Sequence, residues 1–160
     1  MIAEMLPTHK LKIVLVEPEI PQNTGNIARL CAATGAQLHL VRPMGFFLSD
    51  KHFKRAGMDY VKDVQIIVHD DLPGLMLAVR GDPIVLTSGL GGKPYWSHRF
   101  APETWIFFGK ESAGLPRDLL AAYPHAVLQI PMRDETRGLN VSTSAGIVLY
   151  EALRQISPGA

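Results

Sequence analysis

Cysteine is nearly absent from this sequence, with Cys31 the single example among 160 residues. An intramolecular disulfide is therefore excluded, and this cysteine usage fits a reducing cytoplasm. No apolar run reaches the length of a membrane span, and the first residues lack the basic start and apolar core of a signal peptide. We therefore expect a cytoplasmic protein that does not associate with membranes.

An excess of charge of one sign is also lacking, because 16 Lys and Arg against 15 Asp and Glu leave a formal net charge of +1. Any surface for nucleic acid must therefore be local. The six histidines are scattered, with no ligand-like pair and no second cysteine, so no metal site is expected. The densest basic cluster, Lys51, His52, Lys54 and Arg55, indicates a solvated helix face, or phosphate contacts if RNA binds.

Short apolar, β-branched runs alternate with helical patterns along the whole chain. This alternation predicts an α/β fold in which a parallel sheet is covered by helices on both faces. No linker or repeat divides the sequence, so we expect one domain over residues 1–160, with a core from about 11 to 154. Strands are expected at 11–16, 37–41, 64–68, 83–87, 104–108 and 126–130, and helices at 23–34, after Asp50, at 71–80, at 116–122 and from Ser142 onward.

The site of such a sheet lies outside the carboxyl ends of its strands. Three loops qualify by position, 86–92, 108–115 and 130–142, and all are rich in Gly, Pro, Ser or Asn. Two common phosphate-binding patterns are missing. No Gly-x-Gly-x-x-Gly follows a strand, and Leu115-Pro116 stands where a phosphate loop carries Lys followed by Ser or Thr. A generic α/β nucleotide-binding protein is a further possibility, but the sequence lacks both of its common phosphate-binding patterns.

The stretch 137–150 joins a polar loop to an apolar helix. Ser142 is expected to cap that helix, because its hydroxyl can accept a hydrogen bond from an unpaired backbone N–H of the first turn. Asn23 and Asn26 stand in the same way before another helix, where Asn23 suits a cap or a substrate contact equally.

Three blocks of this sequence together resemble the SPOUT class of RNA methyltransferases. They are Asn23-Thr-Gly-Asn-Ile-Ala-Arg29, Phe108-Gly-Lys-Glu-Ser-Ala-Gly-Leu-Pro116, and Ile130-Pro-Met132 followed by Arg137-Gly-Leu-Asn-Val-Ser-Thr-Ser144. They occur in the family's order, and the similarity extends from Leu11 to about Arg154. The segments 17–21 and 43–46 narrow the resemblance to the small tRNA (cytidine/uridine 2′-O)-methyltransferases that act on the wobble nucleotide.

The resemblance implies a deep C-terminal trefoil knot and S-adenosylmethionine as cofactor, with S-adenosylhomocysteine as product and no metal. It also implies a tRNA substrate and a homodimer in which each active site uses Arg29 of the partner subunit. At position 138 close relatives often carry serine, whereas this sequence has glycine. A side-chain contact with the cofactor is therefore lost there, and the backbone contact remains available. The cofactor-binding positions carried over are Leu86, Thr87, Gly89, Gly109, Glu111, Ile130, Met132, Gly138, Leu139 and Asn140.

The resemblance places Arg29, Asn23, Ser142 and Tyr150 at the reaction centre. A guanidinium remains protonated in proteins, so Arg29 suits stabilisation of a developing alkoxide better than removal of a proton. Two of the site residues also have a purely structural interpretation. Glu111 could be a surface carboxylate, and Tyr150 could belong to the core or to an interface. Expected RNA contacts are Lys51, Lys54, Arg55 and Arg137, the last of which could instead pair with an acid.

Two alternatives to wobble methylation remain open at this stage. A SPOUT ribose methyltransferase could act on another tRNA or rRNA position. An RNA-binding module could keep the fold without catalysis, although all three sequence blocks are intact.

Overall fold

The computed structural model describes residues 5–159, and for residues 57–61 it describes the backbone alone. Strands and helices alternate as the sequence predicts. In chain order they are β1 Lys12–Val16, α1 Pro21–Thr34, β2 Gln37–Val41, α2 Lys51–Val61, β3 Ile66–His69, α3 Leu72–Val79, β4 Ile84–Thr87, β5 Lys93–Pro94, the 3-10 turn η2 Tyr95–Ser97, β6 Trp105–Phe108, α4 Arg117–Ala122, the 3-10 turn η3 Pro124–Ala126, β7 Val127–Gln129 and α5 Val141–Ile156.

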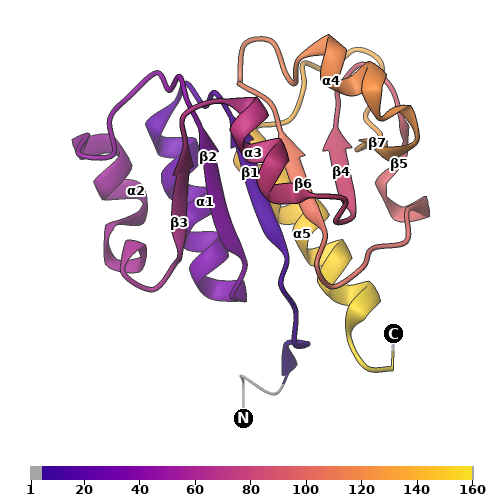
Figure 1. The fold of residues 1–160 in the computed structure, drawn as a ribbon, viewed down its shortest axis with the longest axis horizontal. Coiled ribbons are helices and arrows are strands. Elements are labelled where there is room, and N and C mark those ends of the chain that lie inside the picture. The colour runs from indigo at the N-terminus through magenta and orange to yellow at the C-terminus, as the bar shows by residue number, and fades with distance from the viewer. Residues whose placement is uncertain (1–4, 160) are drawn as a thin grey trace.

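The strands form one seven-stranded sheet in the order β3-β2-β1-β6-β4-β7-β5. Every neighbouring pair is parallel, which confirms the predicted fold class. Because all strands run the same way, their carboxyl ends meet at one edge of the sheet, the upper edge in Figure 1. The loops that follow β1, β2, β4, β6 and β7 therefore gather at that edge.

Alternating residues of β1 supply two separate cores, one on each face of the sheet. Ile13 and Leu15 pack in a cluster with residues of α1 and α5, whereas Val14 and Val16 pack with residues of α3 and α4. Figure 1 shows the two pairs of helices on opposite sides of the sheet. Burial on both faces explains why residues 13–16 of this strand are all apolar.

Local signals explain where the helices begin and end. Pro21 occupies the first turn of α1, where its fixed φ suits a helix, so the helix begins two residues before the expected Asn23. Gly35 ends it in the left-handed conformation, with φ 81°. In α3 the Asp71 side chain accepts a hydrogen bond from the Gly74 N–H at 2.8 Å, as predicted for a cap.

Helix α2 packs on α1 rather than on the sheet. A Cβ added to Gly25 of α1 would lie 2.4 Å from the Cβ of Ala56, so the two backbones approach closely at a residue without a side chain. Cys31 lies on the buried face of α1 in the core. Burial raises the pKa of its thiol to about 12, so it remains protonated and unreactive.

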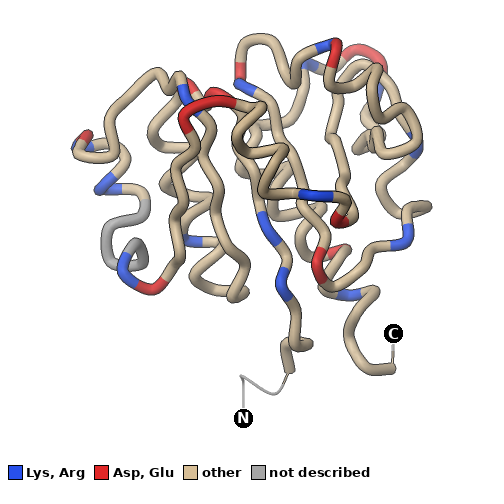
Figure 2. The backbone as a smooth tube through the Cα atoms, in the orientation of Figure 1, with Lys and Arg blue, Asp and Glu red and all other residues tan. Residues whose placement is uncertain are grey.

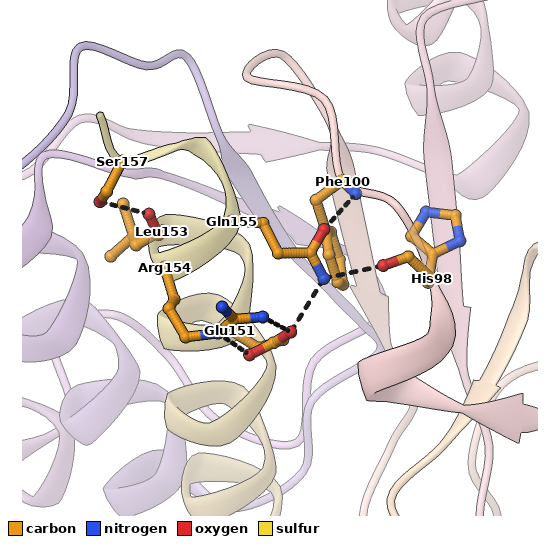
Figure 3. A network of polar contacts seen from close by, with 7 residues as sticks. All are labelled: His98, Phe100, Glu151, Leu153, Arg154, Gln155 and Ser157. Carbon is orange, nitrogen blue, oxygen red and sulfur yellow. Dashed lines mark hydrogen bonds and ion pairs between the residues drawn. The ribbon is translucent and has the colours of Figure 1, made fainter. Parts of the chain in front are cut away.

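The carboxyl end of α5 is tied to the segment before β6 by Gln155 (Figure 3). Its Oε1 accepts the Phe100 N–H at 2.9 Å, and its Nε2 donates to the His98 carbonyl at 2.8 Å and to the Glu151 carboxylate at 2.8 Å. Glu151 also accepts two hydrogen bonds from Arg154, which lower its pKa. One amide thus joins the last helix to a segment 55 positions earlier in the chain.

The structure differs from the sequence prediction mainly at short elements. Strand β5 was not expected, because its two residues lie next to a glycine-rich loop and form a strand only by pairing with β7. Strand β3 begins at Ile66 rather than at residue 64. Among the residues described, no helix is long and apolar enough to cross a membrane.

Candidate functional site

The loops after β4, β6 and β7 enclose a cavity of about 650 Å³ together with the starts of α1 and α5. These are the three loops that the sequence predicted to meet. The volume lies within the range of small-molecule sites, roughly 300–1,000 Å³. The lining residues are Ile20, Asn23, 87–90, 108–115, Leu120, Ile130, Met132, 138–141 and Ser144.

The loop after β6 folds back tightly on itself and needs glycine at its start. The Gly114 N–H donates to the Lys110 carbonyl at 2.8 Å, which closes the turn. A Cβ added to Gly109 would lie 2.0 Å from the Gly114 carbonyl carbon and 2.1 Å from the Leu115 nitrogen, so only glycine fits. Gly114 itself has φ 72°, which also favours glycine. The loop is therefore a fixed wall of the cavity.

Two glutamates exchange hydrogen bonds between this loop and the turn before α1. The Glu111 carboxylate accepts the backbone N–H groups of Glu19 at 2.8 Å and Ile20 at 3.2 Å. In return the Glu19 carboxylate accepts hydrogen bonds from the Ser112 hydroxyl at 2.8 Å and from the Ser112 backbone N–H at 2.9 Å. These two hydrogen bonds hold the pKa of Glu19 below its usual value. Lys110 and Glu17 add an ion pair at 3.8 Å. We call this set the loop clamp.

Asn23 joins the loop clamp to the start of α5. It is only 5% exposed, and its Nδ2 donates to the Glu111 carboxylate at 3.3 Å. Its Oδ1 accepts from Asn140 Nδ2 at 2.9 Å. Asn23 therefore lies inside the first turns of α1 and does not cap it, and Asn26 lies on the exposed side of the same helix.

The expectation that Ser142 caps α5 is wrong. The cap is Asn140, whose Oδ1 accepts the Ser142 N–H at 2.8 Å. Ser142 lies in the first turn and its hydroxyl donates to the same oxygen. Asparagine is as good a cap as serine, and the choice depends on the loop geometry before the helix, which the sequence pattern does not give.

Most of the expected cofactor positions line the cavity. Leu86 is the exception, because it is fully buried beneath the β4 loop and packs in the core on the α3 side. The Thr87 hydroxyl donates to the Phe107 carbonyl at 2.8 Å, so its side chain supports the wall. The positions that do line the cavity are Thr87, Gly89, Gly109, Glu111, Ile130, Met132, Gly138, Leu139 and Asn140.

Of the four residues expected at the reaction centre, Asn23 alone lines the cavity. Arg29 is exposed on α1, and Tyr150 is 50% exposed on α5. Both helices cover the same face of the sheet. Neither Arg29 nor Tyr150 lines the cavity of the chain that carries it.

The basic cluster lies on α2 as an exposed face. Lys51, Lys54 and Arg55 are exposed, while Phe53 between them is 3% exposed and faces inward. Figure 2 shows basic positions along this helix. Arg137 is also exposed, in the loop that precedes α5. In the part of the chain that the structure describes, no group of three or more His, Cys, Asp or Glu side chains is placed to hold a metal ion.

The loop clamp was not predicted in full. Glu111 was named, but the roles of Glu17, Glu19, Lys110 and Ser112 were missed. The available signal was the pair of acidic residues in the turn 17–21, which was used only for the family resemblance.

Comparison with known proteins adds independent information. The family model described as the SpoU rRNA Methylase family matches residues 10–150. A tRNA (cytidine(34)-2′-O)-methyltransferase of Burkholderia ambifaria is 42% identical over 146 residues, which are 89% of this chain and 94% of that protein.

Solved structures agree with these similarities. A structure described as giving insights into the 2-OH methylation of C/U34 on tRNA matches with a TM-score of 0.88 and 43% identity, over 92% of this chain and 97% of that chain. An AdoMet-bound rRNA methyltransferase from Sinorhizobium meliloti matches with a TM-score of 0.83 and 26% identity, over 96% of this chain and 59% of that chain.

Proposed function

The chain belongs to the SpoU rRNA methylase family, and on that premise we propose that it methylates the ribose 2′-hydroxyl of the wobble cytidine or uridine of tRNA. The observation that carries the proposal is the cavity of about 650 Å³ between the loops after β4, β6 and β7, in a chain 42% identical to a tRNA (cytidine(34)-2′-O)-methyltransferase. Methylation of another tRNA or rRNA position is the second candidate. Its support is the rRNA methyltransferase neighbour, at the lower identity of 26%.

The cavity fits S-adenosylmethionine. A Cβ added to Gly89 or Gly138 would meet nothing within 4 Å, so a ligand can approach the backbone at both places. Ile130, Leu139 and Leu120 offer apolar cover for an adenine ring. When bound, the cofactor supplies an electrophilic methyl group on a sulfonium. We assign its binding to the nine cavity-lining positions named above, with Leu86 supporting them from beneath.

Within one protomer the described residues leave the cavity without an evident proton acceptor. Lys110 and Glu111 are its only ionisable lining side chains. Lys110 pairs with Glu17, and the Glu111 carboxylate accepts two hydrogen bonds from the turn before α1 and one from Asn23. The chain's own contribution is then positioning, which supplies up to about 7–11 kcal/mol in well-oriented reactions. Asn23, Asn140 and Ser142 hold the cavity wall against which the ribose would lie.

A second copy of the chain would supply the cationic group that the first copy does not bring to the cavity. We propose a homodimer in which Arg29 of the partner subunit stabilises the developing alkoxide at the 2′-oxygen. Arg29 and Tyr150 are exposed on α1 and α5, which cover the same face of the sheet. Ile20 and Leu139, at the mouth of the cavity, are 41% and 43% exposed. Pairing of two copies through this face would bury these side chains and bring Arg29 toward the other cavity.

The tRNA backbone would be held by Lys51, Lys54, Arg55 and Arg137. Such contacts set register and affinity and carry no sequence information. We also propose that residues 1–160 act as one domain, in which the segment before α5 threads a loop to form a trefoil knot. Strand β7 lies between β4 and β5, although both of those strands precede it in the chain. That order is consistent with threading.

The test is transfer of labelled methyl from S-adenosylmethionine to tRNA that lacks 2′-O-methylation, followed by nucleoside analysis. We expect label in 2′-O-methylcytidine or 2′-O-methyluridine at the wobble position, lost in Arg29→Ala. Arg99→Ala is the matched control, because Arg99 is exposed near the carboxyl end of α5, away from the cavity. Label at another position would favour the second candidate. Absence of both transfer and S-adenosylhomocysteine binding would contradict the proposal.

Sharing of sites between copies has its own test. Arg29→Ala and Asn140→Ala proteins, each inactive, are mixed under conditions that exchange subunits. If sites are shared, a mixed dimer has one site with both residues intact, and activity returns. If each chain used its own Arg29, the mixture would remain inactive.

A further inference from the structure

Phe47 is the most exposed phenylalanine, at 81%, although its neighbour Phe46 is 8% exposed. Phe46 packs inward, with its ring 6.1 Å from that of Phe53 on the buried side of α2. Because the Phe46 ring occupies the buried side of this segment, the Phe47 ring faces solvent. Single exposed apolar residues are common on proteins, so the position of Phe47 decides what it means.

The segment that carries Phe47 is fixed at both ends. On one side the Gly45 N–H donates to the Pro18 carbonyl at 2.9 Å, and a Cβ on Gly45 would lie 2.8 Å from the Glu19 carbonyl oxygen. On the other side the Phe47 carbonyl accepts the Asp50 N–H at 2.8 Å. The Asp50 side chain in turn accepts the His52 N–H at 2.7 Å, at the start of α2. Phe47 is therefore held in place by backbone contacts.

The segment that carries Phe47 connects the turn beside the cavity to the basic face of α2. On the cavity side, Gly45 packs on Glu19, and the adjacent Ile20 lines the cavity. On the other side the helix that begins at Lys51 carries Lys51, Lys54 and Arg55, which are all exposed. An RNA chain that places one nucleotide in the cavity and its phosphates on α2 would pass over this segment.

We propose that Phe47 stacks on an unpaired nucleobase of the tRNA beside the nucleotide being methylated. The occupant is a base because an exposed aromatic ring next to a cationic surface is the combination that single-stranded RNA recognises, through stacking and phosphate contacts. This inference rests on the proposed function, since it needs a tRNA in the cavity. It adds a residue that touches the substrate without taking part in the transfer.

The test compares Phe47→Ala, Phe47→Leu and Phe47→Trp with Leu77→Ala. Leu77 is 70% exposed on α3 and provides a matched exposed apolar control away from the cavity. We expect Phe47→Ala to raise the KM and Kd for tRNA about tenfold, the order of one stacking contact, with kcat and S-adenosylhomocysteine affinity unchanged. Phe47→Trp should retain affinity. Phe47→Leu should lose most of it, because leucine is apolar but cannot stack.

Three results would overturn the proposal. The first is an unchanged Kd in Phe47→Ala, and the second is full affinity in Phe47→Leu. The third is a change in sedimentation mass with unchanged tRNA affinity per dimer, which would assign Phe47 to contact with a second copy. The binding measurement keeps this inference separate from the proposed function. If the wild-type protein binds tRNA through Phe47 but transfers no methyl group, the proposed function is contradicted and the proposed stacking contact is still supported.

Discussion

The side-chain amide of Asn140 donates to the Oδ1 of Asn23 at 2.9 Å, across 117 positions of the chain. Asn140 caps α5, and Asn23 also donates to Glu111 in the loop after β6. One buried amide thus connects α1, the start of α5 and the loop clamp. The cavity walls come from these same segments, so their relative position depends on Asn23.

Asn23→Ala should therefore weaken both stability and ligand binding. It removes a donor and an acceptor from a site that is 5% exposed, which costs about 1–3 kcal/mol when partners are left unsatisfied. Urea unfolding and calorimetric titration with S-adenosylhomocysteine measure the two effects. Asn26→Ala, at an exposed position of the same helix, should change neither. Equal behaviour of the two variants would show that Asn23 does not hold the walls together.

Gly109→Ala should disrupt the loop after β6. The added Cβ would meet backbone atoms at 2.0 and 2.1 Å, so the turn between residues 110 and 114 must open. We expect a loss of about 3 kcal/mol or more in the free energy of unfolding, above the usual range for overpacking, and loss of S-adenosylhomocysteine binding.

Gly146→Ala is the control, because its Cβ would meet nothing within 4 Å inside α5. It should gain up to about 1 kcal/mol from helix propensity. Wild-type affinity in Gly109→Ala would contradict the account of this wall.

The histidine pair between β2 and β3 predicts loss of stability in acid. His39 Nδ1 lies 2.9 Å from His69 Nε2, and the His39 ring also packs against Trp105. Burial, with the charges of His69 and Lys12, lowers the pKa of His39 from 6.5 to about 4, and burial also lowers the pKa of His69. The unfolded chain then binds more protons than the folded one between about pH 6.5 and 4. Stability is complete above this window and falls as the pH falls through it, by roughly 2–3 kcal/mol for His39.

Unfolding free energies measured from pH 7.5 to 4 check this prediction. His39→Gln should flatten the curve in that window, because glutamine at position 39 does not titrate and only the smaller contribution of groups such as His69 remains. His125→Gln, at an exposed position, should leave the slope unchanged. A slope that is the same in His39→Gln and in the wild type would assign the acid sensitivity to other groups.

Gln155 and Arg154 are adjacent in sequence but should differ in their effect on stability. Gln155→Ala leaves the Phe100 N–H and the His98 carbonyl without their partner, at a cost of about 1–3 kcal/mol (Figure 3). Arg154→Ala removes an ion pair whose arginine side chain is 63% exposed, so the loss of stability should be the smaller of the two. Thermal unfolding of both variants at one pH measures the difference. A larger loss in Arg154→Ala would mean that the amide does not anchor α5.

These contacts show which features of the fold and of the site can be predicted from the sequence alone. Local patterns predicted β2 at its observed bounds and the Asp71 cap of α3, because both depend on neighbouring residues. The expected cofactor positions around the cavity were carried over from the resemblance to a family. The cap at Asn140, the two-residue strand β5 and the exchange between Glu19 and Glu111 were missed. Each depends on partners distant in the chain or on loop geometry, and periodicity carries no information about either. The exposure of Phe47 beside a buried Phe46 likewise depends on how α2 packs on α1.

Binding of tRNA should depend on salt through the basic face of α2. Each lysine or arginine that neutralises a phosphate contributes about 0.7–0.9 to the slope of log K against log salt concentration. If all three residues contact phosphates, the triple variant Lys51→Ala, Lys54→Ala, Arg55→Ala should reduce that slope by about 2 to 3. Filter binding between 50 and 200 mM salt, roughly the range over which such contacts lose affinity, measures it.

The control is the double variant Lys10→Ala, Arg99→Ala, which removes two exposed cations from the opposite edge of the sheet. The cofactor affinity should stay unchanged in both variants, because none of these residues lines the cavity. An equal fall in slope in the two variants would mean that tRNA responds to net charge and not to this helix face.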